Sequence, residues 1–119
     1  MTHHLTLRTR ATASGQLVEL AGELDHHTAP EVRAALPALE LRAGQQLVLD
    51  LGALTFCDSS GVTVLIAARN HALAAEAGIV LVTVPDRVSR ILRIVGLDQV
   101  FPFHPTAQDA EAAWQHTAG

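Results

Sequence analysis

The chain has 119 residues, the length of one globular domain, which at this size buries roughly two-thirds of the surface that its unfolded form exposes. Hydrophobic residues make up 49% and charged residues 17%, and no apolar run approaches the ~20 residues that span a bilayer. The formal net charge is −4 and no basic cluster occurs, so neither a membrane-spanning protein nor a nucleic-acid-binding one is expected.

The basic residues are all arginine, and the chain contains no lysine. A Schiff-base lysine, the lysine of a phosphate-binding P-loop and the lysine of a protein-kinase site are therefore excluded. The same absence argues against a phospho-aspartate receiver domain, a class of similar size that relies on a lysine beside its phosphoryl group. Residues 1–10 lack the apolar core of a signal peptide, so a cytoplasmic location is expected.

Two stretches of alternating apolar and polar residues, at 3–9 and 16–24, open the chain and predict a β-hairpin with its turn at 12–15. Beyond the hairpin, helix-like and strand-like apolar patterns alternate along the sequence. The predicted helices cover residues 28–44, 59–77, 85–96 and 106–116, and the predicted strands cover residues 46–51, 79–84 and 100–103.

The first predicted helix has a recognisable start. Thr28 and Glu31 have the spacing of a capping box, and Pro30 lies just inside the helix. Pro37 predicts a kink or a break within the helix, and Gly44 predicts its end. The residues predicted to face the core are Val32, Leu36 and Leu39.

In the second and third predicted helices, apolar residues recur every three or four positions, and Gly78 and Gly96 mark the expected ends. Between them, residues 79–84 are almost continuously apolar, which is typical of a strand buried on both faces. The residues predicted to face the core are Val62, Leu65, Ile66 and Leu73 in the second helix and Val88, Ile91, Leu92 and Val95 in the third.

The resulting order, β-β-α-β-α-β-α-β-α, predicts a single α/β domain over residues 1–119. Strands separated by helices pair in parallel through right-handed crossovers, and the opening hairpin makes the sheet mixed. We therefore expect a mostly parallel sheet of about five strands with about four helices.

Two loops hold the residues that could take part in catalysis, binding or modification. "GELDHH" follows the second strand, and "FCDSSG" precedes the second major helix. Functional loops of parallel α/β sheets collect beyond the carboxyl ends of the strands. If the two strands are neighbours, the side chains of 25–27 face those of 58–60 across one edge of the sheet.

Several interpretations of "DSSG" remain open on local chemistry alone. Asp58, Ser59 and Ser60 are suited to capping a helix, which is worth ~1 kcal/mol. A serine hydrolase would need the upstream glycine of a nucleophile elbow, which Cys57 and Asp58 replace, and a base from His26 or His27. A serine at a helix start is also a place where a phosphate is electrostatically favoured.

Metal binding has little support, because Asp25, His26 and His27 are consecutive and adjacent residues rarely converge on one ion. We expect neither a metal nor a cofactor. The single cysteine, Cys57, cannot form an internal disulfide, and it lies in an apolar run. It is expected to be a small buried hydrophobic residue.

Three motifs resemble the STAS-domain anti-sigma-factor antagonists of bacteria. They are "GELDHHTAPEV", "LDLGALTFCDSSGVTVL" and "VSRILRIVGLDQVF", and the resemblance extends from about Gly15 to Phe103. It implies a non-enzymatic regulator that binds an anti-sigma factor, itself a serine kinase, and so releases a sigma factor for transcription. The kinase would switch the protein off by phosphorylating it, and a serine phosphatase would restore it.

The resemblance also implies where the switch lies. The family's phosphorylated serine, the first of "DSSG", falls on Ser59, and the family's two nearby acids fall on Asp58 and Asp25. The other residues expected at the partner-binding surface are His26, Ser60, Gly61 and Thr63.

Three residues depart from the family pattern. Cys57 replaces a larger apolar residue, Pro37 interrupts the first helix, and Thr63 stands where the antagonists often have glycine. The bulk of Thr63 would alter partner choice, or its hydroxyl would itself be modified. The alternative function is a STAS subunit of a lipid-transport or stress-signalling complex, which needs no reversible phosphate.

Overall fold

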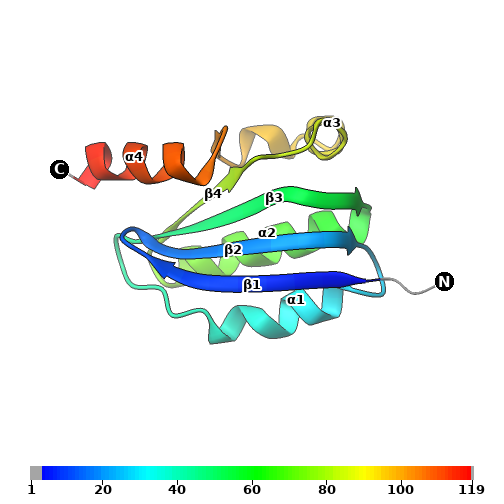
Figure 1. Cartoon of the computed structure of the whole chain (residues 1–119), viewed down its shortest axis with the longest axis horizontal. Helices are drawn as coiled ribbons and strands as arrows, with labels where there is room; N and C mark the ends of the chain where they lie inside the picture. The colour runs from blue at the N-terminus through cyan, green and yellow to red at the C-terminus, as the bar shows by residue number, and fades with distance from the viewer. Residues whose placement is uncertain (1–3, 119) are drawn as a thin grey trace.

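The computed structural model describes the backbone of residues 4–118 and the side chains of residues 4–114. Five strands form one sheet in the order β1-β2-β3-β4-β5 (Figure 1). β1 pairs with β2 antiparallel, and the other neighbours pair in parallel, which confirms the predicted mixed sheet with its opening hairpin. The strands are β1 Leu5–Thr12, β2 Gly15–Leu24, β3 Gln46–Cys57, β4 Gly78–Val82 and β5 Phe103–His104.

The four predicted helices are present. They are α1 Ala29–Ala35, α2 Ser59–Ala74, α3 Asp86–Ile94 and α4 Ala107–Ala118, with short 3₁₀ turns at η1 Leu36–Ala38 and η2 Leu97–Gln99. α1 and α2 cover one face of the sheet, while α4 packs on the other face and α3 follows the carboxyl end of β4 (Figure 1).

Alternating side chains of β3 build two core layers, because successive residues of a strand point to opposite faces. Leu47, Leu49 and Leu51 belong to the larger cluster, under α1 and α2. Val48 belongs to the smaller one, which α4 closes with Ala110. The apolar run of β4 is buried on both faces, as predicted.

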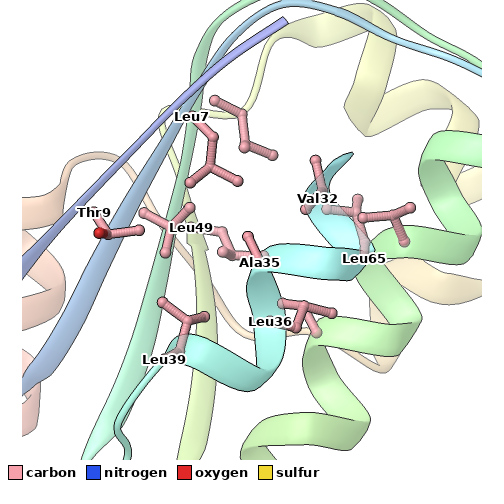
Figure 2. Close-up of a pocket in the computed structure, with 12 residues that line it drawn as sticks. Leu7, Thr9, Val32, Ala35, Leu36, Leu39, Leu49 and Leu65 are labelled. Atoms are coloured by element: carbon pink, nitrogen blue, oxygen red, sulfur yellow. The ribbon is translucent and has the colours of Figure 1, made fainter. Parts of the chain in front are cut away.

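The larger core layer leaves almost no free space between the sheet and the two helices. The cavity there measures about 10 Å³, which is at most the room for one water molecule. Figure 2 shows the side chains that close it, which come from β1, β2, β3, α1, α2 and the η1 segment through its C-cap, and include Leu7, Leu36, Leu39, Leu49 and Leu65. This region is a packed core and offers no ligand site.

The first helix corrects one expectation and confirms another. The predicted capping box is wrong, because the side chain of Thr28 makes no cap hydrogen bond to the helix. Its hydroxyl lies 2.6 Å from the Glu23 carbonyl oxygen instead. The break at Pro37 is confirmed: α1 ends at Ala35, and the chain passes through η1 to an extended segment, well before Gly44.

The second and third helices differ from prediction at their C-terminal ends. α2 ends at Ala74 rather than at Gly78, and Glu76, with a φ of 58°, makes the left-handed turn. Leu73 and Val95, both expected in the core, are 49% and 54% exposed. Gly96, with a φ of 79°, does end α3 as predicted.

Strand bounds also differ from prediction, as in β5 and β3. η2 ends at Gln99 and a turn follows it, so β5 begins only at Phe103 and is two residues long. β3 runs six residues beyond the predicted end, to Cys57, and its pairing with β2 shifts register after Glu19 and again after Gly22. The longer β3 carries the chain directly into the loop that contains Ser59.

Candidate functional site

The loops after β2 and β3 lie side by side, as expected from the sequence. Leu24, the last residue of β2, is in register with Cys57, the last residue of β3. One residue further, the Asp58 backbone N–H donates to the Leu24 carbonyl oxygen at 3.3 Å. Residues 25–27 and 58–60 therefore share one edge of the sheet.

Asp58 is the N-cap of α2. Its backbone is extended, and its Oδ1 accepts hydrogen bonds from the backbone N–H groups of Ser60 at 2.8 Å and Gly61 at 3.1 Å. A carboxylate here satisfies amides that the helix leaves free and interacts favourably with the helix dipole. The helix-cap interpretation is thus confirmed for Asp58, and it leaves Ser59 out of the cap.

Ser59 is the first residue of α2, and its side chain is exposed. Thr63, one turn further along, is exposed as well, and its hydroxyl donates to the Ser59 carbonyl oxygen at 3.0 Å. Residues four apart lie on the same face of a helix. Both hydroxyl-bearing side chains therefore face outward from the first turns of α2, while Ser60 is half-buried.

Gly61 is buried where α2 comes closest to the sheet. A Cβ atom added there would lie 2.7 Å from Cys57 Sγ and 2.9 Å from both Leu24 Cγ and the Leu24 carbonyl oxygen. No side chain fits without moving backbone. Glycine at this position lets the helix start pack directly against the ends of β2 and β3.

Asp25 is only 4% exposed, and its carboxylate holds its own loop together. Its Oδ1 accepts from the backbone N–H of His27 at 2.9 Å and from that of Thr28 at 3.1 Å. The Asp25 backbone N–H in turn donates to Thr28 Oγ1 at 3.0 Å. Asp25 thus sets the shape of the loop beside Ser59.

His26 and His27 are exposed, and their rings meet edge to face with centroids 5.6 Å apart. Among residues 4–114, no three His, Cys, Asp or Glu side chains come together in a way that could hold a metal ion. His26 lies in the loop after β2, which shares an edge of the sheet with the Ser59 loop.

Cys57 is 3% exposed and packs in the larger core layer, as predicted. Burial raises the pKa of its thiol from the ordinary 9.0 to about 11, and the neighbouring Asp58 carboxylate adds to the rise. The thiol is therefore neutral near pH 7. A buried, protonated cysteine is a packing residue rather than a nucleophile.

The backbone around Ser59 lacks the strained turn of a nucleophile elbow. A nucleophile elbow places its serine on a sharp, strained turn between strand and helix. Among described residues other than glycine, only Glu76 and Thr83 have a positive φ, and neither is near the start of α2. Ser59 begins a regular, capped helix.

Two contributors to the site were missed by sequence reasoning. Leu24 receives the Asp58 N–H and packs against Gly61, and Arg87 of α3 donates from Nη1 to the Thr55 carbonyl oxygen of β3 at 2.8 Å. The parallel pairing of β2 with β3 could have indicated Leu24. Nothing local to Arg87 signals its contact.

The sequence of this chain resembles those of known proteins. A family model described as the STAS domain matches residues 7–110. The chain belongs to the STAS domain family. The anti-sigma-B factor antagonist of Listeria monocytogenes is 33% identical over 81 residues, which are 68% of this chain and 71% of that protein.

Two further relatives agree. The anti-sigma F factor antagonist of Paenibacillus polymyxa is 35% identical over 96 residues, covering 79% of this STAS chain and 81% of its own length. A crystal structure of an anti-sigma factor antagonist from Mycobacterium paratuberculosis superposes with a TM-score of 0.80 at 30% identity, covering 94% of this chain and 95% of the other. No helix within the described residues is both long and apolar enough to cross a membrane.

Proposed function

We propose that this STAS protein is an anti-sigma-factor antagonist whose unphosphorylated form binds an anti-sigma factor and thereby releases a sigma factor. The proposal rests on family membership and on relatives that are named as such antagonists. The single observation that carries it is the exposed Ser59 at the capped start of α2. The first turn of α2 here presents a hydroxyl that takes no part in the helix cap.

Ser59 is the acceptor that the local geometry favours. Its side chain is exposed, whereas Ser60 is half-buried on the helix side of the loop. The hydroxyl of Thr63 is already engaged with the Ser59 carbonyl oxygen. A kinase can therefore reach the Ser59 hydroxyl with the least rearrangement.

A phosphate on Ser59 would leave the isolated protein intact. It adds about −1.5 to −2 charges, and the start of α2 interacts with it favourably by ~0.3–1 kcal/mol. The side chain is exposed and takes no part in the Asp58 cap, so no hydrogen bond of the cap need break. The modified and unmodified chains should have the same fold.

In a complex the same phosphate is unfavourable. A partner packed on this surface removes water, and Asp58 is held in place by two amides. Two unit charges ~6 Å apart repel by roughly 3 kcal/mol at an effective dielectric of ~20, but by only about 0.7 kcal/mol in water. The increase on binding, about 2 kcal/mol, weakens binding about 30-fold before steric exclusion is counted.

The partners follow from this scheme. The anti-sigma factor is also the serine kinase that modifies Ser59, and a serine phosphatase removes the phosphate. The chain itself acts as a binding protein and needs no cofactor, because ATP is bound by the kinase. Asp25, His26, Asp58, Ser60, Gly61 and Thr63 form or shape the surface that the partner contacts.

Phosphosite mapping by mass spectrometry, on protein isolated with its bound partners from its native cells, tests the proposal. We expect phosphate on Ser59 and a kinase-like partner enriched with the unmodified fraction only. Ser59→Ala should bind that partner persistently and Ser59→Asp poorly, with Ser60→Ala behaving as the unaltered chain. A chain that is never modified and always bound to a transport or scaffold subunit would instead support the fixed-subunit function.

A further inference from the structure

A groove lies at the end of the molecule away from Ser59, beneath α4. Its volume is about 630 Å³, within the ~300–1,000 Å³ that small-molecule sites occupy. The first residues of β3 and β4 line it, whereas Ser59 follows the other end of β3. We call it the α4 groove, and its lining includes Gly44, Gln46, Glu76, His104 and Trp114.

Hydrogen bonds between segments far apart in sequence hold the walls of the α4 groove. The Gly44 N–H donates to the Glu76 carbonyl oxygen at 3.1 Å, joining the loops before β3 and β4. The Gly44 carbonyl oxygen accepts from Trp114 Nε1 at 3.0 Å. The indole of α4 is therefore a fixed aromatic wall, with its polar N–H already used.

The charge of the α4 groove favours a cation. Of the described residues that line it, the ionisable ones are Glu76 and His104, none is arginine, and the chain contains no lysine. Gln46 donates both of its amide hydrogens, to Ser14 Oγ at 3.1 Å and to the Ala110 carbonyl oxygen at 3.2 Å. What Gln46 can still offer a ligand is an acceptor oxygen.

We propose that the α4 groove binds a small organic ammonium ion. The Trp114 ring attracts a cation through its π face, and the Glu76 carboxylate balances the charge that an apolar wall alone could not accommodate. An anion would be repelled by the Glu76 carboxylate. The site is separate from the Ser59 surface, so a test of ammonium binding and a test of the phosphorylation switch can each fail without affecting the other.

Titration of the full chain with choline tests the site. Trp114 is the only tryptophan and the chain has no tyrosine, so intrinsic emission reports on the groove directly. The matched neutral probe is 3,3-dimethylbutan-1-ol, which replaces the nitrogen of choline by carbon. We expect saturable binding of choline, about 10-fold or more tighter than that of the alcohol.

Two glutamate variants test whether choline binds in the α4 groove. Glu76→Gln should weaken choline binding about 2- to 5-fold in calorimetry, while Glu40→Gln, the same change at an exposed site outside the groove, should not alter it. Equal affinity for choline and the alcohol would overturn the proposal. So would unchanged binding by Glu76→Gln, or the absence of saturable choline binding.

Discussion

At the scale of single residues, Gly61 determines how closely α2 approaches the sheet. Replacing it by alanine places a methyl group 2.9 Å from the Leu24 carbonyl oxygen, a backbone atom that cannot move aside cheaply. Overpacking of this kind costs about 1–3 kcal/mol. We expect Gly61→Ala to lower the free energy of unfolding by that amount in urea titrations.

Gly78→Ala is the matched control for Gly61→Ala. A Cβ atom added to Gly78 meets nothing within 4 Å, and its φ is not positive. Its effect should stay within about 0.5–1 kcal/mol. If both variants changed stability equally, close packing at Gly61 would not be what the position requires.

Cys57 gives the molecule a distinctive alkaline titration. Its folded pKa of about 11 lies above the ordinary 9.0, so the folded state keeps its proton longer than the unfolded state does. The contribution of the protonated thiol to the free energy of unfolding is then fully present below pH 9.0, and it is lost as pH rises towards about 11. The slope is at most about 1.4 kcal/mol per pH unit.

This loss can be assigned to one side chain. The chain has no lysine and no tyrosine, the other side chains that would titrate in this range. Urea unfolding at a series of pH values should show the decline in the natural chain and a flat profile in Cys57→Ala. A decline that persists in Cys57→Ala would refute the assignment.

At the scale of elements, polar contacts help to attach α4 to the sheet. Buried Ser14 donates to Glu111 Oε1 at 2.6 Å and accepts from Gln46 Nε2, whereas Ala110 is the buried apolar residue that α4 adds to the smaller core layer. Ser14→Ala leaves the Glu111 carboxylate without this donor, at a cost of about 1–3 kcal/mol.

The loss should be local. Hydrogen exchange of α4 backbone amides should become faster in Ser14→Ala, while the amides of α2, which contacts the other face of the sheet, serve as the internal reference. Equal acceleration in both helices would mean that Ser14 supports the whole core rather than α4.

The order of elements was predictable, and several of their ends were not. Periodicity and glycine placement gave the strand and helix order, but the start of α1 depends on Asp25, which takes the Thr28 N–H that a capping box would use. The inward face of α2 includes Ala68 and Ala72, so the larger neighbour Leu73 lies outside it. Such competition between neighbours is settled by tertiary packing.

The candidate site was also predictable only in part. Neighbouring parallel strands bring their following loops together, so Asp58 and Asp25 were placed at one edge correctly. The bracing role of Asp25 and the contact of Leu24 with Gly61 depend on distances of a few ångströms. No pattern in a single sequence encodes them.

At the scale of the whole molecule, β3 separates two surfaces. Its carboxyl end leads to Ser59 at the start of α2, and its amino end lines the α4 groove. A phosphate on exposed Ser59 should leave the core layers and α4 unaltered. The midpoint of thermal unfolding should therefore stay within a few degrees between the two phosphorylation states.

The central claim is that one phosphate on Ser59 switches partner binding. The most direct measurement is the dissociation constant of the full chain for its anti-sigma factor, determined by calorimetry with the unmodified and the Ser59-phosphorylated protein. We predict that phosphorylation weakens binding about 30-fold or more while the fold is kept. Equal affinities of the two forms would contradict the account.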